Sequence, residues 1–300
     1  MKSGRSDYLV RATALDGRVR AFAVDSTGVT AELSGRHGTE PAVTAALGRL
    51  ATGALMFSAM LKKSQHTVSI RILGDGPAGV LLAAANGNGE VRGLVGRPVT
   101  GADQVSNGKL NVAGVVGRNG RLTVTRDLGL RHPYVGVVEL VSGEVGEDLA
   151  HYLVSSEQTP SAVGVGVFVG GGGEVAAAGG WMVQLLPGVP TADATRIEDA
   201  IRGLPHPTTM IRSGDTPEDV LARIFPSGFE SLDRLPVRFH CPCTAERVER
   251  ALSLLGEAEV RSILEKDRAG GITEVTCEFC GERYTLDTAA MEAIAVRARR

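Results

Sequence analysis

The first two thirds of the chain are dominated by short segments in which apolar and polar residues alternate. Two of them, residues 8–15 and 19–25, flank Asp16-Gly17, a pair typical of a hairpin turn. More segments of this kind follow at near-regular spacing, separated by turns rich in glycine, asparagine and proline. We expect strands over residues 67–73, 79–85, 90–95, 111–116, 121–126, 134–141, 162–169 and 175–185. This spacing indicates antiparallel sheets.

Three segments among these strands have a helical pattern, and the first is a short helix that Ser26 or Thr27 can cap. Thr39-Glu40-Pro41 is a typical helix start, and residues 42–61 then carry mostly alanine, leucine, methionine and glycine, with no charge after Arg49. A helix that is apolar on most faces is usually buried, so we expect this one inside the core. Residues 146–154 also fit a helix. Helices mixed with antiparallel strands predict an α+β fold for a large N-terminal domain, residues 1–187.

The pattern changes after Pro187-Gly188-Val189-Pro190, where the chain becomes more polar and helical. Apolar residues follow helical spacing between residues 197 and 204, and a second helix is expected from Thr216-Pro217 to Phe225. We interpret residues 188–236 as a helical linker. Few of its residues can face a core, so the linker is expected to be marginally stable alone.

The last segment, residues 237–300, has the pattern of a small α+β domain. Thr244 can cap a helix that Gly256 ends, and a second helix is expected over residues 257–266. Strands are expected at 272–276 and 282–286, around a tight turn, and Asp287 can cap a last helix.

Composition and charge restrict the classes of function. The chain has 300 residues, 43% of them hydrophobic, which suits a globular protein of about two domains. Its formal net charge is −2, which argues against a general nucleic-acid or anionic-membrane binder. The sequence shows no signal-peptide pattern and no plausible membrane span. We therefore expect a cytoplasmic protein, in which clustered cysteines are more often metal ligands or redox groups than structural disulfides.

All four cysteines lie in the last segment, as the pairs Cys241-Pro242-Cys243 and Cys277-Glu278-Phe279-Cys280. Two close pairs of thiols brought together by a fold match a tetrahedral four-cysteine zinc site. The spacing of the second pair, followed by Gly281, is that of an ordinary zinc knuckle, whereas one intervening residue in the first pair is unusual. His240 offers an alternative ligand, but we expect it to lie beside the site. The alternatives to a metal site are a redox dithiol and thiols without a role.

A metal site in this segment has a consequence for stability. A unit of 64 residues with few large apolar side chains often needs a bound metal or a cross-link to fold. Zinc can supply several kcal/mol of folding free energy. Oxidation of the thiols would release the zinc and remove this stabilisation. Disulfides within such close pairs would close small, strained rings and be labile. The residues therefore leave two hypotheses open, a redox-responsive unit and a purely structural zinc.

With these cysteine pairs, the chain resembles the redox-regulated holdase chaperones of the 33 kDa heat-shock protein (33 kDa chaperonin) family, over essentially its whole length. The most specific marks are the Cys-x-Cys and Cys-x-x-Cys pairs after a helical linker. Further marks lie in the large domain: Gly74-Asp75-Gly76-Pro77, Val141-Ser142-Gly143-Glu144, Ser156-Glu157-Gln158 with Pro160-Ser161, and Gly179-Gly180 followed by Gln184-Leu185-Leu186-Pro187-Gly188.

The resemblance implies a mechanism. In the reduced, inactive state Cys241, Cys243, Cys277 and Cys280 would bind one zinc ion. Oxidant together with unfolding stress would form Cys241–Cys243 and Cys277–Cys280 disulfides and release the zinc. The last domain and the linker would then unfold and uncover apolar surface that holds unfolding proteins without ATP, in a form associated with homodimers. Such a protein is not an enzyme, and its partners are unfolding proteins, with no nucleic acid and no membrane.

Two other classes of function compete with this interpretation. A zinc-ribbon adaptor with a structural zinc would favour a basic, aromatic face, but residues 237–300 hold 10 basic and 11 acidic side chains and three aromatic ones. A thiol–disulfide oxidoreductase would place its cysteine pair at a helix start, whereas this pair is expected in a hairpin. No motif identifies the client-binding residues. The candidates are apolar residues of the linker: Ile197, Ile201, Val220 and Phe225.

Overall fold

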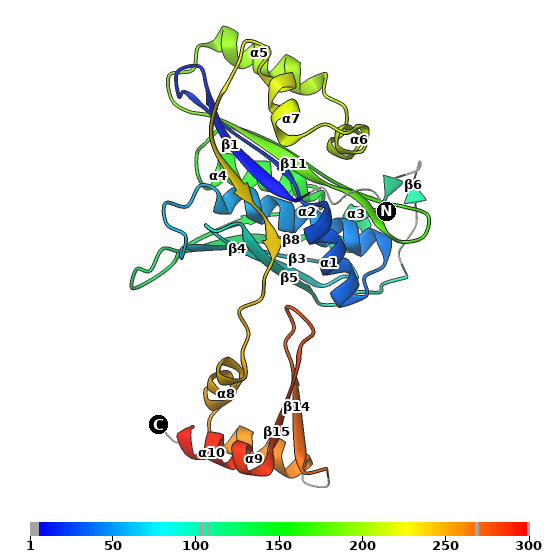
Figure 1. Ribbon diagram of the computed structural model, residues 1–300, viewed down its shortest axis with the longest axis vertical. Coiled ribbons are helices and arrows are strands. Elements are labelled where there is room, and N and C mark those ends of the chain that lie inside the picture. The colour runs from blue at the N-terminus through cyan, green and yellow to red at the C-terminus, as the bar shows by residue number, and fades with distance from the viewer. Residues whose placement is uncertain (1–5, 102–104, 107–108, 268–269, 299–300) are drawn as a thin grey trace. The chain divides into compact units, whose positions relative to one another are not determined.

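The computed structural model describes residues 6–101, 105–106, 109–267 and 270–298. The chain divides into two compact units, residues 1–240 (unit 1) and 241–300 (unit 2) (Figure 1). The fold is α+β, as the sequence predicts. Residues 188–240 belong to unit 1, and the division at 187/188 and 236/237 stays a prediction about separable parts of the chain.

The described residues of unit 1 form two large sheets and one short two-stranded sheet. The first has five strands in the order β10-β11-β2-β1-β12, and the second has six in the order β13-β5-β4-β3-β8-β9. The strands of the first sheet are β1 (Tyr8–Ala14), β2 (Val19–Asp25), β10 (Ser161–Val169), β11 (Val175–Leu185) and β12 (Glu230–Pro236). Those of the second are β3 (Thr67–Gly74), β4 (Val80–Asn86), β5 (Glu90–Val95), β8 (Gly120–Asp127), β9 (Tyr134–Glu139) and β13 (Arg238–Phe239). A further short pair is β6 (Val105–Ser106) and β7 (Lys109–Leu110).

The helix α2 (Pro41–Ser58) lies between the two sheets and forms the centre of the core. Pro41 at its first turn fixes the start, and every residue of the helix except Pro41 and Arg49 is buried. The prediction that this helix lies buried in the core is therefore confirmed, although the helix ends at Ser58 and not at Leu61. Three other helices flank this layer: α1 (Thr27–His37), α3 (Val112–Val116) and α4 (Val145–Ser155).

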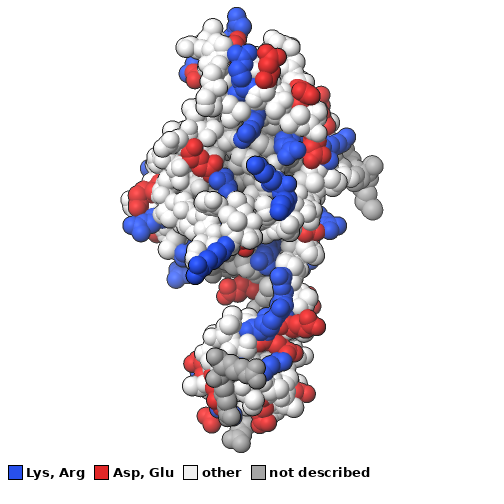
Figure 2. Space-filling model, turned by 90° about the vertical axis from the view of Figure 1, so that its left-hand side faces the viewer, with Lys and Arg blue, Asp and Glu red and all other residues white. Residues whose placement is uncertain are grey.

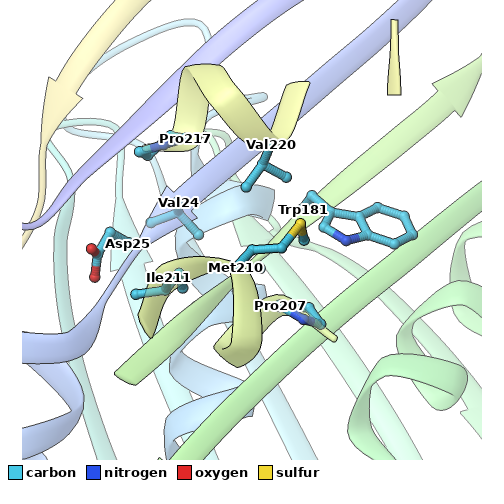
Figure 3. Close-up of a pocket in the computed structure, with 9 residues that line it drawn as sticks. Val24, Asp25, Trp181, Pro207, Met210, Ile211, Pro217 and Val220 are labelled. Atoms are coloured by element: carbon cyan, nitrogen blue, oxygen red, sulfur yellow. The ribbon is translucent and has the colours of Figure 1, made fainter. Parts of the chain in front are cut away.

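The opposite face of the five-stranded sheet is covered by α5 (Thr191–Arg202), α6 (Pro207–Ser213) and α7 (Pro217–Ile224). Figure 3 shows Trp181 of β11 beside Met210 of α6, with Val220 of α7 above them. These side chains line a cavity of about 10 Å³, room for at most one water molecule. Of the proposed client-binding residues, Ile197, Val220 and Phe225 are buried in this layer and Ile201 packs against it, so none of them forms an exposed apolar face in this form.

Several expected elements differ from the observed ones. Residues 112–116 form a helix rather than a strand, because the Asn111 side chain accepts a hydrogen bond from the Gly114 N–H and caps the turn. The hairpin between β1 and β2 needs four residues, with Leu15, Asp16 and Gly17 at positive φ, not a two-residue turn. Residues 230–236 of the expected helical linker form β12, paired with β1. The helix α6, which begins at Pro207, has no counterpart in the expected elements.

Unit 2 follows the sequence prediction closely. Its elements are α8 (Ala245–Ser253), α9 (Glu257–Lys266), β14 (Ile272–Thr276), β15 (Arg283–Asp287) and α10 (Thr288–Arg297). Thr244 and Asp287 cap α8 and α10 through their side chains, as their positions before apolar periodic segments predict. The strands β14 and β15 form a two-stranded antiparallel sheet.

Two surface features bear on the expected partners. On the face shown in Figure 2, basic and acidic side chains of unit 1 are dispersed among uncharged residues and form no single basic patch. Within the described part of the chain, none of the helices has the length and apolar character that a bilayer crossing requires.

Candidate metal centre

The four cysteines gather at one point in unit 2. Their Sγ atoms all lie within 4.8 Å of one another, with Cys241 and Cys277 3.8 Å apart and Cys243 and Cys280 3.3 Å apart. Four sulfurs bound tetrahedrally at a Zn–S distance of about 2.3 Å would be about 3.8 Å apart. The donor set and its spacing therefore fit a zinc ion, with each close pair supplying two ligands.

The turn between β14 and β15 positions the second pair. The Cys277 N–H donates to the Glu282 carbonyl, and the Gly281 N–H donates back to the Cys277 carbonyl at 2.8 Å. Gly281 has φ +73°, a conformation that few other residues adopt at low cost, which explains the glycine directly after the pair. The Glu282 N–H also donates to the Cys280 sulfur, so a backbone amide stabilises a thiolate at this turn.

The first pair precedes α8. The Thr244 hydroxyl accepts from the Arg247 N–H and fixes the start of the helix immediately after Cys243. The Arg247 guanidinium donates to the Pro242 carbonyl at 2.7 Å, which ties the Cys-Pro-Cys segment to the first turn of α8. These two contacts fix the segment that carries both sulfurs, which lie within 4.8 Å of each other.

Tyr284 is a site residue that the motif spacing did not reveal. Its hydroxyl, on β15, donates a hydrogen bond to the Cys243 sulfur. Tyr284 lies opposite Val275 in the β14–β15 ladder, so register, not proximity in sequence, brings it to the first pair. A donor to a ligating sulfur orients that ligand and stabilises its charge.

The electrostatics of the cluster favour a bound cation. Burial raises the pKa of the Cys280 thiol well above its usual range. At Cys243 burial also raises the pKa, but hydrogen bonds from Tyr284 and the neighbouring thiols outweigh it, and the net pKa is lowered. Four adjacent thiolates repel one another, and a divalent cation removes that penalty by deprotonating and binding them together.

His240 lies outside the sulfur cluster. Its side chain is exposed, and its backbone N–H donates to the Val91 carbonyl in unit 1. Among the described residues, the group able to hold a metal consists of the four cysteines alone. The expectation that the histidine is not a ligand agrees with this placement.

Comparison with known proteins finds similarity to one family over nearly the whole chain. The family model described as "Hsp33 protein" matches residues 7–287. The "33 kDa chaperonin" of Bacillus subtilis is 45% identical over 96% of this chain and 98% of its own length, and that of Geobacillus kaustophilus is 45% identical over 96% and 97%. The crystal structure of a 33 kDa chaperonin from Thermotoga maritima superposes with a TM-score of 0.88 at 33% identity, over 97% of this chain and 98% of that one. By its sequence, its fold and its cysteine cluster, this chain belongs to the Hsp33 family.

Proposed function

We propose that this chain is a redox-regulated, ATP-independent holdase: it binds unfolding proteins and prevents their aggregation without releasing them by hydrolysis of ATP. The observation that carries the proposal is the four-cysteine cluster at the centre of a small unit. Membership of a family whose relatives are named chaperonins supports the chaperone role. The protein binds clients and performs no turnover, so it is not an enzyme.

In the reduced state, Cys241, Cys243, Cys277 and Cys280 bind one Zn²⁺ and the chaperone is inactive. The bound ion supplies a fixed centre that joins the segment before α8 to the β14–β15 turn. The apolar core of unit 2 is small, with Leu252, Val260, Leu286, Met291, Ile294 and Ala295 as its buried members. Metal binding therefore supplies a large share of the folding free energy of this unit.

Oxidation of the cysteines removes the folding free energy that metal binding supplies to unit 2. In each pair two thiolates lose two electrons and form one disulfide, while one hydrogen peroxide takes up two electrons and two protons to give two waters. We propose the pairing Cys241–Cys243 and Cys277–Cys280, on the family resemblance. Disulfide sulfurs carry no charge and no longer hold the ion, so zinc is released. Unit 2 and residues 188–236 then unfold and uncover apolar surface.

The active form is proposed to be a homodimer in the cytoplasm, with unfolding proteins as partners and no nucleic acid or membrane. A thiol switch of this kind requires a compartment that keeps the cysteines reduced until an oxidant appears. The reducing cytoplasm meets that requirement.

Light scattering from a thermally unfolding test protein examines the proposal. The chain is added either zinc-loaded and reduced, or after treatment with peroxide at elevated temperature. We expect only the oxidised sample to suppress scattering, together with release of one zinc per chain and the two proposed disulfides in a mass-spectrometric map. If neither sample suppresses scattering, the holdase proposal fails and a structural zinc in an adaptor protein becomes the better account.

The matched control is Thr285→Ser, an exposed position on β15 in the same unit. This variant is expected to switch like the parent chain, whereas Cys277→Ser is expected to lose zinc and to bind clients without oxidant. A Cys277→Ser variant that stays inactive under all conditions, although it no longer binds zinc, would contradict the coupling between metal and activity.

A further inference from the structure

Met291 of α10 lies in the apolar core of unit 2. It is the one methionine in residues 241–300, and its side chain is fully buried. The same cluster contains Leu252 of α8, Val260 of α9 and Leu286 of β15. The helix α10 contacts all the other elements of the unit, α8, α9, β14 and β15. In the folded unit the thioether sulfur of Met291 is therefore shielded from solvent.

The elements that pack around Met291 also carry the metal ligands. Cys243 directly precedes the cap of α8, and Cys277 and Cys280 lie in the turn between β14 and β15. The apolar packing of α10 and the cysteine cluster thus hold α8 and the β14–β15 hairpin together in two separate ways. Because metal binding and folding are coupled in a unit of this size, a change that weakens the core also lowers the affinity for zinc.

A methionine thioether reacts with the same class of oxidant as a thiolate. One hydrogen peroxide transfers an oxygen atom to the sulfur, which loses two electrons, while the O–O bond breaks and one water leaves. The product is a sulfoxide, which is polar and accepts hydrogen bonds. The buried members of the cluster around Met291 are all apolar, so their side chains offer the sulfoxide oxygen no donor. Burying such an oxygen without a partner opposes folding.

We propose that Met291 is a second oxidation site, which oxidant reaches only after the cysteines have lost the zinc and unit 2 has unfolded. Its sulfoxide prevents unit 2 from refolding when the thiols are reduced again, so the chain stays zinc-free and active. This inference rests on the proposed redox-regulated function and deepens its regulation. Thiol reductants restore the cysteines, whereas a sulfoxide needs a dedicated reductase. Brief oxidation is thus reversed by thiols alone, and prolonged oxidation is not.

Unit 1 contains two methionines that serve as internal controls. Met56 and Met182 are as fully buried as Met291, but they belong to the large main core. Apolar burial does not respond to oxidants, so these two thioethers stay shielded when the cysteines are oxidised. Met210 lies in α6, within residues 188–236, which are proposed to unfold together with unit 2. Its oxidation is expected alongside that of Met291, and it is not used as a control.

The order of oxidation is tested on the full-length chain by peptide mapping in a mass spectrometer. The reduced chain, either zinc-loaded or stripped of zinc with a chelator, is treated with the same concentration of hydrogen peroxide. We expect the initial rate of sulfoxide formation at Met291 to be about tenfold or more higher in the zinc-free chain, because its unit 2 is unfolded. Met56 and Met182 should react slowly in both samples. Equal rates at Met291 with and without zinc, or reaction of Met56 and Met182 as fast as that of Met291, would overturn the proposal.

The effect of the sulfoxide is tested by rebinding of zinc. Chain oxidised by peroxide at elevated temperature is reduced with a thiol, and its zinc affinity is measured in competition with a chromogenic chelator. We expect an affinity at least about tenfold lower than that of chain that was never oxidised. Met291→Leu, which keeps the side-chain volume and resists oxidation, should regain its own starting affinity within about threefold. The control Met182→Leu should lose affinity as the parent chain does.

Repair of the parent chain decides the matter without a substitution in the core. Treatment of the oxidised and thiol-reduced parent chain with methionine sulfoxide reductase should restore zinc binding. Full zinc binding by chain that still carries the Met291 sulfoxide, or a loss of affinity in Met291→Leu as large as in the parent chain, would contradict the inference.

Failure of this inference is distinguishable from failure of the proposed function, because neither the mapping nor the zinc measurement involves a client. If oxidised chain suppresses aggregation but thiol reduction returns it to the inactive, zinc-loaded form while Met291 is oxidised, the holdase function stands and the inference fails. If oxidised chain does not suppress aggregation, the function fails, and the zinc affinities still decide whether the Met291 sulfoxide blocks refolding of unit 2.

Discussion

Units 1 and 2 reach a stable fold by different means. Unit 1 encloses an 18-residue helix between two sheets, and its main core contains many fully buried apolar side chains. Among the described residues of unit 2, the apolar cluster has six buried members, and the four cysteines converge on one point. Apolar burial does not respond to oxidants, whereas a thiolate cluster does. The contrast fits the proposal that one chain combines a permanent scaffold with a part whose stability depends on redox conditions.

Removal of the metal has the largest expected effect: it unfolds unit 2 and, with it, residues 188–236, and leaves the core of unit 1 folded. Chelation of zinc from the reduced chain should remove several kcal/mol from the stability of unit 2 and unfold it. Amide hydrogen exchange should then lose protection in α8, α9 and α10 but not in α2 or β3. Unit 2 that stays protected after complete chelation would show that its apolar core suffices.

Truncation of a buried side chain in α2 should weaken unit 1 and leave unit 2 intact. Leu50 is fully buried at the centre of α2, so Leu50→Ala should lower the free energy of unfolding of unit 1 by about 3 kcal/mol in urea titration. The control Leu254→Ala, at a position 88% exposed in unit 2, should change stability by less than about 0.5 kcal/mol. Zinc affinity should be the same in both variants, and a loss of affinity in Leu50→Ala would mean that the units are coupled.

Mild acid should move the two units in opposite directions. Burial raises the pKa of Asp7 to about 6, so the folded state binds more protons than the unfolded state between about pH 4 and 6, and unit 1 gains stability as pH falls through this window. The full difference from the ordinary value corresponds to about 3 kcal/mol, and partial exposure of the carboxyl reduces the expected gain to about 1–2 kcal/mol. Unit 2 should lose zinc over the same range, because protons compete for the thiolates.

Urea titrations at pH 7 and 5 measure this response. Asp7→Asn should remove most of the pH dependence of unit 1, whereas Asp16→Asn, whose side chain is 95% exposed, should retain it. An unchanged slope in Asp7→Asn would assign the effect to another carboxyl group.

The smallest expected effect concerns the hydroxyl of Tyr284. Tyr284→Phe removes the donor to the Cys243 sulfur and should weaken zinc binding by about tenfold, or about 1.4 kcal/mol, in competition with a chromogenic chelator. The control Tyr134→Phe, at an exposed position of unit 1, should leave the affinity unchanged. Equal affinity in both variants would mean that the hydroxyl adds nothing to the cluster.

Much of unit 2 could be predicted from sequence because its signals are local. Caps at Thr244 and Asp287 mark helix starts, Gly256 separates two helices, and the spacing of the paired cysteines indicates a metal site. The sequence did not identify Tyr284 as a site residue, because its contact with Cys243 depends on strand register and spans 41 residues. Local spacing carries no information about such a contact.

In unit 1, several elements could not be predicted from the local sequence. Residues 112–116 have the composition of a strand, and only the Asn111 cap indicates a helix. Residues 230–236 lack the alternation of a half-buried strand because nearly all of them are exposed, and their place is fixed by pairing with β1, more than two hundred residues earlier. Long-range pairing therefore decided β12 against its local pattern, whereas a local cap decided the helix at residues 112–116.

The position of α2 between the sheets also has a consequence for biosynthesis. The helix ends at Ser58, but β10 and β11, which cover one of its sides, extend from Ser161 to Leu185. At about 5–20 residues per second, the ribosome needs on the order of ten seconds to make the intervening chain. During that time an apolar helix lacks its cover, so the nascent chain itself requires protection from aggregation. We therefore expect a protein of a chaperone family to need, while it is being made, the protection that chaperones give to others.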